Sequence, residues 1–219
     1  RTCPDAPAAL DLHERLEQRL AQWRASPWYN ADDMREGDLS LELLDQMHIP
    51  AWLHQYRDVS IGCMTGLPPV SSEEDAASFL ALVAQTNDAE YAVMHHEHGF
   101  VGAVGVRCLE DMVHIHFWIG IDHQGKGLGT RATQLLIRCL AKSHVRHVFT
   151  SVFCGNLRSR RILDKAGFRA ISHDARGDDQ GYLFMHLALQ QTPGIGCAAD
   201  ELKQRLARMC ECIGEPLAR

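Results

Sequence analysis

The chain has 219 residues, a hydrophobic fraction of 46% and a formal net charge of -6 at pH 7. This length and composition predict a globular protein with one sizeable core, and the negative charge argues against binding of nucleic acid through phosphate neutralisation. No apolar run reaches the roughly 18 to 20 residues of a membrane span, and no secretory signal opens the sequence. We therefore expect a cytoplasmic protein without a nucleic-acid or membrane partner.

The first predicted element is an amphipathic helix over residues 11–23, whose apolar side chains recur at helical spacing. A strand over 39–44 and helices over 48–56 and 71–85 follow. Three strands over 91–96, 100–108 and 112–121, separated by short breaks, then predict an antiparallel meander. The later elements are helices over 127–142, 157–166 and 202–213 and strands over 147–153, 168–172 and 182–189.

This order predicts an α+β (mixed α/β) fold with a mixed, mostly antiparallel sheet of about six to seven strands flanked by helices. A Pro-Gly stretch at residues 192–196 indicates a linker before the last helix. The chain then divides into an N-terminal helical extension (1–37), a central domain (38–190), and a linker with a C-terminal helix (191–219). The two end helices either cover the central domain or join two subunits, so a monomer and a homodimer both stay open.

The Cys and His content does not predict a metal site. The eight cysteines form no CxxC pair and most lie in apolar runs, which favours reduced, mainly buried thiols. Residues 95–98 read HHEH, but adjacent side chains of a strand point to opposite faces, and Gly99 indicates an exposed hairpin turn there. We expect no bound metal.

A glycine-rich loop follows the third strand of the meander. Residues 123–130 read HQGKGLGT, with glycines at alternate positions, directly after the apolar run HIHFWIGI. Glycines allow a ligand to approach the backbone closely, and the N-terminus of a following helix attracts negative charge. This segment therefore predicts a phosphate-binding site.

Two common phosphate loops fit the sequence poorly. The P-loop pattern GxxxxGK[ST] does not occur, which excludes that class of nucleoside triphosphate hydrolases. GLGTRA at residues 127–132 satisfies the dinucleotide-binding pattern GxGxx(G/A). The following strand, HVFTSVFC, lacks the acidic residue that would hold the ribose, and antiparallel strands precede the loop where βαβ units are required.

A third pattern accounts for the loop and for its surroundings. Gln124, Gly127 and Gly129 match the Q/R-x-x-G-x-G/A signature of the GNAT family of N-acetyltransferases, and NLRSRRILDKAGF at 156–168 resembles its NxxSxxxLxKxGF segment. The run FWIGIDHQGKGLGT resembles the ribosomal-protein N-terminal acetyltransferases, the Rim-type branch. The resemblance covers about residues 38–189 and leaves both end helices outside.

The resemblance implies the GNAT fold and acetyl-CoA as co-substrate. In this family the loop amides hold the pyrophosphate, and the central strand splays from its neighbour so that the cofactor pairs with its backbone. The implied cofactor-binding residues are Phe117, Trp118, Ile119, Gln124, Gly125, Lys126, Gly127, Leu128, Gly129, Thr130, Asn156, Ser159 and Arg161. For Asn156, capping of the following helix is the alternative to holding the pantetheine arm.

The implied reaction is direct attack of a primary amine on the thioester in a ternary complex. His114 occupies the place where relatives often carry a glutamate base, and a neutral imidazole suits proton removal at neutral pH. His116 is a second candidate, either as a base or as a residue that narrows the acceptor pocket. Leu163 stands where many members carry a proton-donating tyrosine, so Ser159 is the expected donor to the thiolate. Structural hydrogen bonds are the alternative for both histidines.

The acceptor is expected to be a peptide N-terminus or a small amine-bearing metabolite or antibiotic. Trp52, Tyr56, Met64 and His116 either line its pocket or, for the apolar residues, belong to the core. A turn over residues 174–180, with three aspartates, is a further candidate for holding a cationic acceptor. Because the usual tyrosine and glutamate are absent, a CoA-binding regulatory or interaction module with little or no turnover stays open as the alternative function.

Overall fold

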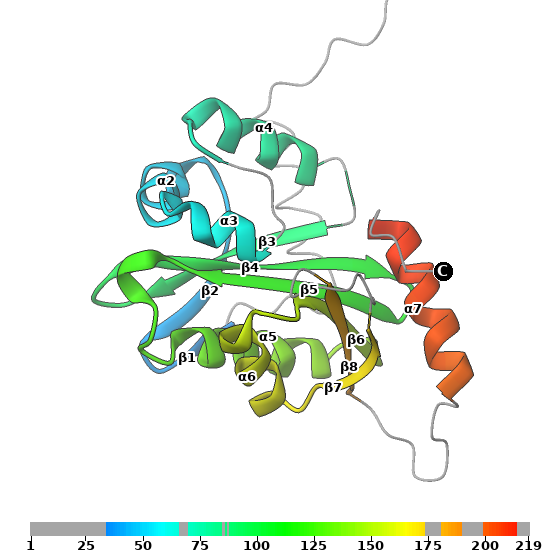
Figure 1. The fold of residues 1–219 in the computed structure, drawn as a ribbon. Coiled ribbons are helices and arrows are strands. Elements are labelled where there is room, and N and C mark those ends of the chain that lie inside the picture. Colours follow the sequence, from blue (N-terminus) through cyan, green and yellow to red (C-terminus); the bar gives the residue numbers. More distant parts are fainter. Residues whose placement is uncertain are drawn as a thin grey trace, which may run out of the picture.

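The computed structural model describes residues 34–65, 70–84, 86, 88–173, 181–189 and 199–213. In this part of the chain, eight strands form one sheet flanked by six α-helices (Figure 1). The strands are β1 (Arg35–Glu36), β2 (Leu39–Leu43), β3 (Asp88–His95), β4 (Gly99–Leu109), β5 (Met112–Ile119), β6 (His147–Phe153), β7 (Arg169–His173) and β8 (Tyr182–Ala188). The helices are α2 (Ile49–Tyr56), α3 (Val59–Thr65), α4 (Glu73–Val83), α5 (Leu128–Ala141), α6 (Leu157–Lys165) and α7 (Ala199–Ile213), with 3-10 turns η1 (Gln46–His48) and η2 (Ile121–His123).

The sheet has the strand order β1-β2-β3-β4-β5-β6-β8-β7, and its strand pairs are antiparallel except for β5 with β6. The predicted mixed, mostly antiparallel sheet is therefore confirmed. Seven of the strands correspond to the predicted ones. The eighth, β1, has two residues, too few for a periodic pattern to indicate it.

The one parallel pair of strands is short and then opens. β5 and β6 pair only from Met112 to His114 and from His147 to Phe149. Beyond this point the two strands diverge, and the Thr150 hydroxyl donates a hydrogen bond to the Ile115 carbonyl oxygen at 2.9 Å. The second half of β5 thus borders a gap in the sheet.

Helices cover both faces of the sheet. α5 and α6 pack on one face and bury side chains of β5 such as Val113 and Ile115, whereas α2, α3 and α4 lie on the opposite face with Trp118 (Figure 1). α7 covers the second face at its other end, where Leu206 and Met209 pack against Met112. The predicted C-terminal helix is therefore confirmed, and it packs on its own chain.

Local signals explain several element boundaries. Ser72 caps α4 through a capping box with Asp75. The HHEH run turns between β3 and β4, with Gly99 at a φ of +66°. The helix α3 was not predicted, because its sequence VSIGCMT contains a glycine and β-branched residues that are poor helix formers. Of the described cysteines, Cys63 is exposed, and it departs from the expected burial.

Several predictions lie outside the described residues: the helix over 11–23, the linker at 192–196 and the acidic turn over 174–180. The division into three segments stays a prediction. None of the described helices has the length and apolar character to cross a membrane. Among the described residues, no group of three or more His, Cys, Asp or Glu side chains is arranged to hold a metal ion.

Candidate active site

The glycine loop adopts a backbone conformation that side chains disfavour. Gly125 and Gly127 have φ values of +77° and +80°, in the left-handed region, and Gly127 is the N-cap of α5. A Cβ atom added at either position would meet no atom within 4 Å. These two glycines are therefore required by the backbone conformation, and the loop faces open space.

Side chains tie this loop to the neighbouring elements. Gln124 donates from Nε2 to the Ile119 carbonyl oxygen at 3.1 Å, and its Oε1 accepts a hydrogen bond from Arg158 of α6 at 3.1 Å. Lys126 donates to the Asp122 carbonyl oxygen at 3.0 Å. The loop is thus fixed between the end of β5 and α6.

The first turn of α5 supplies backbone donors at the loop. The N–H groups of Leu128, Gly129 and Thr130 come before that of Arg131, which is the first to donate within the helix, to the Gly127 carbonyl oxygen, so the helix leaves them available. A Cβ atom at Gly129 would lie 2.9 Å from the Ile162 Cδ1 atom, so its glycine allows α5 and α6 to pack closely. Together with the helix dipole, these donors form an anion-binding site.

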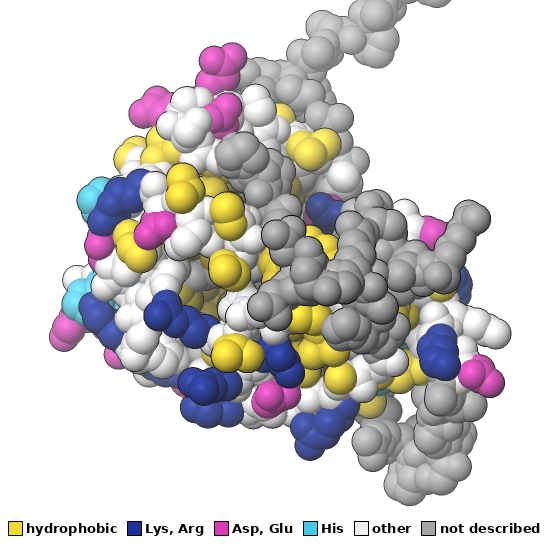
Figure 2. Space-filling model, in the orientation of Figure 1, with side chains coloured by type: hydrophobic (Ala, Val, Ile, Leu, Met, Phe, Trp, Pro, Cys, Tyr) yellow, Lys and Arg dark blue, Asp and Glu magenta, His cyan; other side chains and the backbone are white. Residues whose placement is uncertain are grey.

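A cavity of about 750 Å³ lies between the loop, α3, the end of β5 and the first turn of α6. In Figure 2, hydrophobic side chains surround a hollow on this side of the molecule, and Lys and Arg side chains gather below it. The volume suits a large organic ligand. The lining residues are Ser60, Ile61, Met64, Thr65, Phe117, Trp118, Ile119, His123, Gln124, Gly125, Gly127, Leu128, Gly129, Thr130, Gly155, Asn156, Leu157, Arg158, Ser159, Arg161, Ile162 and Lys165.

The β5 backbone also presents hydrogen-bonding groups to the gap between β5 and β6. The carbonyl oxygens of Ile115 and Ile119 both point away from β4, because they accept hydrogen bonds from Thr150 and Gln124. Alternate residues of a strand direct their backbone groups to the same edge. Phe117, midway between these two residues, therefore directs its N–H and C=O into the gap.

The predicted cofactor residues come together around this cavity, with the exception of Lys126, which does not line it. Sequence reasoning missed the contribution of α3 because that helix itself was not predicted. It also passed over Lys165, although its spacing with Arg158 and Arg161 places all three on one side of α6. Met64, predicted for the acceptor pocket, lines this same cavity.

Asn156 is placed as a structural residue at the rim of the cavity. Its Oδ1 accepts a hydrogen bond from the Ser159 N–H at 3.1 Å and so caps α6, while its Nδ2 donates to the Met64 carbonyl oxygen of α3 at 3.2 Å. The alternative role as a helix cap is thus present. Contact of Asn156 with pantetheine stays a prediction.

His114 is buried and lies close to Ser151, with 3.3 Å between Nε2 and the serine hydroxyl oxygen. Burial, followed by the positive charges of His116 and Arg107, lowers the pKa of His114 from 6.5 to about 3. The imidazole therefore stays neutral near pH 7. A group with this pKa retains an accepted proton poorly, which weakens the prediction that His114 is the base.

His116 has a carboxylate partner instead. Its Nε2 lies 2.9 Å from Oε1 and 3.2 Å from Oε2 of Glu90 in β3, and Glu90 is buried. The side chain of His116 is 17% exposed and that of Glu90 is 7% exposed. This pair was missed in the sequence, because only the register of three strands places residues 90 and 116 together.

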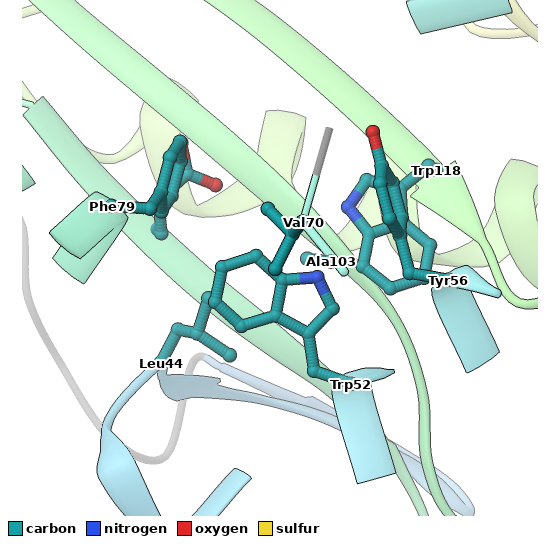
Figure 3. Close-up of a pocket in the computed structure, with 8 residues that line it drawn as sticks. Leu44, Trp52, Tyr56, Val70, Phe79, Ala103 and Trp118 are labelled. Carbon is teal, nitrogen blue, oxygen red and sulfur yellow. The ribbon is translucent and has the colours of Figure 1, made fainter. Parts of the chain in front are cut away.

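The aromatic residues predicted for the acceptor pocket lie in the core on the α2–α4 face. Trp52 packs edge-on against Phe79, and Tyr56 packs edge-on against Trp118 at a centroid distance of 4.9 Å (Figure 3). The cavity between them measures about 10 Å³, room for about one water molecule. The burial of Trp52 and Tyr56 in this cluster favours their interpretation as core residues over their interpretation as residues that line an acceptor pocket.

A sheet that splays after a short parallel pairing, with an anion-binding loop at the opening, is the arrangement that the resemblance to the GNAT family of N-acetyltransferases implies. Residues 38–169 match the family described as acetyltransferase (GNAT) domain, and the chain belongs to that family. Acetyl-CoA is its co-substrate and acetyl transfer to an amine is its reaction.

Solved structures of similar fold include a spermidine N-acetyltransferase from Vibrio cholerae in complex with CoA and spermine, with 14% identity, a TM-score of 0.62 and coverage of 70% of this chain and 97% of that one. A ribosomal L7/L12 alpha-N-protein acetyltransferase (RimL) with coenzyme A has 17% identity, a TM-score of 0.61 and coverage of 70% and 95%. Aminoglycoside acetyltransferase AAC(6')-Ib with coenzyme A has 19% identity, a TM-score of 0.58 and coverage of 68% and 94%. No curated protein matches the chain in sequence.

Proposed function

We propose that the cavity at the splay of β5 and β6 binds acetyl-CoA and that a primary amine attacks the thioester there in a ternary complex. The acceptor is a peptide N-terminus or a small amine-bearing molecule. The observation that carries this proposal is the cavity of about 750 Å³, which joins the anion-binding loop, the free edge of β5 and the first turn of α6.

The residues around the cavity fit the chemistry of the cofactor. The first N–H groups of α5 are placed to receive the pyrophosphate, and Arg158, Arg161 and Lys165 add positive charge on the opposite wall. The Phe117 backbone offers one donor and one acceptor for the amides of the pantetheine arm. The bound cofactor supplies an acetyl group activated as a thioester.

The reaction then needs two proton transfers. The nitrogen of the neutral amine must lose one proton as it bonds to the carbonyl carbon, and the departing thiolate must gain one. Ser159, which lines the cavity at the start of α6, is proposed as the donor to the thiolate. The proton acceptor is proposed among the β5 histidines, and His116 has the environment that suits this role better.

The acceptor class rests on similar proteins and stays a proposal. The structural neighbours act on spermidine, a ribosomal protein or aminoglycosides, so a polyamine, a peptide N-terminus and an aminoglycoside are the acceptors to examine. A cytoplasmic location and a monomeric or homodimeric state likewise stay predictions.

A thiol-release assay tests the proposed function. Acetyl-CoA is mixed with the protein and a panel of polyamines, N-terminal peptides and aminoglycosides, and free CoA is followed with a chromogenic thiol reagent. We expect release that depends on one acceptor class, with a product heavier by one acetyl group. The matched control is Gly129→Val, whose added side chain would push against Ile162 and disturb the α5–α6 contact. Equal release with this variant, or none with any acceptor despite acetyl-CoA binding, would contradict the proposal.

A further inference from the structure

Two cross-strand rows on the α2–α4 face place the two β5 histidines in opposite electrostatic surroundings. In the first row, Asp88 of β3 pairs with Arg107 of β4, which pairs with His114 of β5. In the second row, two positions along each strand, Glu90 pairs with Gly105, which pairs with His116. Side chains of alternate residues share a face, so the two rows lie side by side.

The β4 residue in the middle of each row determines which charged group lies next to the histidine. Arg107 occupies the centre of the first row, where its Nε lies 3.2 Å from Asp88 Oδ2, and its positive charge contributes to the low pKa of His114. The carboxylate of that row is thus engaged by a guanidinium. His114 has a cation as its cross-strand neighbour.

The second row has a glycine at its centre. A Cβ atom at Gly105 would overlap the ring of His116 and the carboxylate of Glu90. The missing side chain therefore leaves the space in which the imidazole crosses β4 and reaches Glu90 on the third strand. Both carboxylate oxygens then lie within 3.2 Å of Nε2. Gly105 therefore leaves room for the contact between His116 and Glu90, and its own backbone needs no unusual φ.

We propose that His116 is the proton acceptor for the amine and that Glu90 is its positioning residue, held in contact by the glycine at position 105. This inference rests on the proposed function, because it assigns the base for that same reaction. A carboxylate buried beside an imidazole fixes the ring orientation and stabilises the imidazolium that forms when the base takes up a proton.

The hydrogen-bonding pattern assigns the two ring nitrogens. A carboxylate accepts only, so Nε2 carries the hydrogen that faces Glu90, and Nδ1 holds the lone pair. The proton of the neutral amine moves to Nδ1 as the nitrogen–carbon bond forms, and the carbon–sulfur bond breaks to release a thiolate. The thiolate takes a proton from water, either directly or through the Ser159 hydroxyl, which water then reprotonates. The imidazolium returns its proton to water. His116 is not itself among the residues that line the cavity, but it precedes Phe117, which does line it, and its side chain is 17% exposed.

The other titratable groups around this pair are few among the described residues. Asp88 and Arg107 form the neighbouring row, and His114 lies two residues before His116 on the same face. From α2, Tyr56 lines the small cavity that Glu90 also lines, and burial raises the pKa of its hydroxyl. Near neutral pH, Tyr56 and His114 both stay uncharged, so Glu90 is the negative charge in direct contact with His116.

Three substitutions separate the proposal from a structural role. Glu90→Gln keeps the size of the side chain and removes its charge, Glu90→Asp keeps the charge, and Asp88→Asn, which neutralises the β3 carboxylate of the neighbouring row, is the matched control. The rate kcat is measured against pH, with the KM for acetyl-CoA and the melting temperature determined for each variant. Gly105→Ala offers a fourth variant, which should separate His116 from Glu90 without changing either residue.

We expect Glu90→Gln to lower kcat about 10- to 100-fold with little change in the KM for acetyl-CoA, and to move the acid limb of the pH profile to lower pH. Glu90→Asp should recover part of the rate, and Asp88→Asn should keep most of it. A wild-type rate and pH profile in Glu90→Gln, or a larger loss in Asp88→Asn than in Glu90→Gln, would overturn the proposal.

A second readout is independent of turnover. The ring-nitrogen NMR signals of His116 are assigned by their absence in His116→Asn and followed from pH 5 to 9 in the wild type and in Glu90→Gln. A change in that titration on loss of the Glu90 charge supports the pair, and identical curves contradict it. If the wild type binds no acetyl-CoA or turns over no acceptor, the proposed function fails, whereas this titration still decides whether Glu90 acts on His116.

Discussion

At the scale of single residues, Gly127 is held at a φ of +80° although its missing side chain would meet no neighbour. Substitution by alanine therefore adds backbone strain without a clash, at a cost of about 1–2 kcal/mol in unfolding free energy. We predict that Gly127→Ala also weakens acetyl-CoA binding, measured by calorimetry, because the strained loop turns its N–H groups away from the pyrophosphate.

Gly99→Ala is the matched control for this prediction. Gly99 has a φ of +66° and equally open surroundings, but it lies in the β3–β4 hairpin and does not line the cavity. It should lose a similar amount of stability and keep the affinity for acetyl-CoA. Equal affinities in the two variants would show that the loop conformation does not matter for binding.

The two histidines of β5 show what a sequence reveals about single residues. The alternation of the strand places His114 and His116 on one face, and both were identified as candidates from that alternation and from the family resemblance. What distinguishes them is the residue across the sheet, Arg107 or Glu90. Strand register sets that neighbour, and a pattern within one strand carries no information about register.

At the scale of elements, α6 is joined to α3 through Asn156. Its Oδ1 caps α6 and its Nδ2 donates to the Met64 carbonyl oxygen of α3. We predict that Asn156→Ala lowers the unfolding free energy by about 1 kcal/mol through loss of the cap, measured by urea denaturation. Asn156→Asp keeps the accepting oxygen and should retain most of this stability. An equal loss in both variants would mean that the contact with α3 is the larger contribution.

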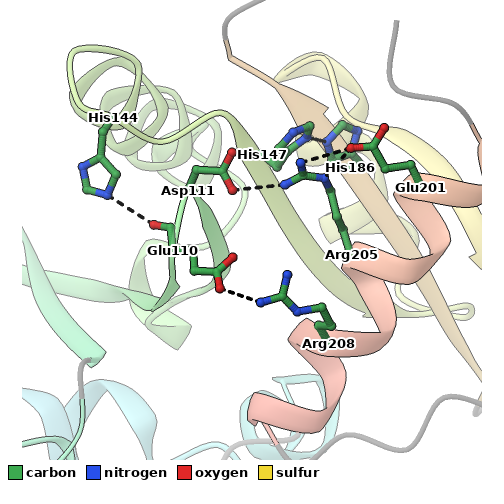
Figure 4. Close-up of polar contacts among 8 residues, drawn as sticks. All are labelled: Glu110, Asp111, His144, His147, His186, Glu201, Arg205 and Arg208. Carbon is green, nitrogen blue, oxygen red and sulfur yellow. Dashed lines mark hydrogen bonds and ion pairs between the residues drawn. The ribbon is translucent and has the colours of Figure 1, made fainter.

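The C-terminal helix α7 combines a buried apolar stripe with ion pairs at the surface (Figure 4). Arg205 lies 3.1 Å from Asp111 and 3.1 Å from Glu201, and Arg208 lies 2.6 Å from Glu110 in the β4–β5 turn. Met209 is fully buried in the contact with the sheet. The stripe was predictable from its helical spacing, whereas the pairing with residues 110 and 111 was not.

We predict that Met209→Ala lowers the unfolding free energy by about 2–4 kcal/mol, because a large buried side chain leaves a cavity. Arg208→Ala, which breaks an exposed ion pair on the same helix, should cost less than about 1 kcal/mol. Chemical denaturation of both variants checks this order. The reverse order would mean that charge, and not apolar burial, holds α7 in place.

At the scale of the whole molecule, two histidines link stability to pH. Burial lowers the pKa of His114 to about 3 and that of His186 to about 4, both from 6.5. Below pH 6.5 the unfolded chain therefore binds more protons at these two histidines than the folded chain does. The stability that depends on the two neutral imidazoles is complete above pH 6.5 and is lost as the pH falls toward 4. We predict a fall in unfolding free energy over this range.

The substitution His186→Gln should make that fall less steep, in urea titrations repeated from pH 7 to 4.5. His96→Gln removes an exposed histidine of the β3–β4 turn and should leave the slope unchanged. A slope that is the same in the wild type and in His186→Gln would contradict the assignment of a half-buried, neutral imidazole at this position.

The architecture was largely predictable from the sequence, because long strands and capped helices carry strong periodic signals. The antiparallel meander, the loop and the helix after it all follow from residues 91–142. The splay between β5 and β6 did not follow from spacing and came only from the family resemblance, since a strand that loses its partner halfway looks in sequence like one that keeps it. The side of the cavity that α3 forms was not predicted, because the sequence of this helix shows no helical periodicity.

The most direct test of the central claim is an amide chemical-shift map of the protein titrated with acetyl-CoA. We predict one bound molecule per chain and large shifts at Phe117, in the loop from Gly125 to Gly127 and in the first turn of α5. The hairpin at Gly99 and the helix α7 should stay unchanged. Absence of binding, or shifts confined to surfaces away from the gap between β5 and β6, would contradict the assignment of this cavity as the acetyl-CoA site.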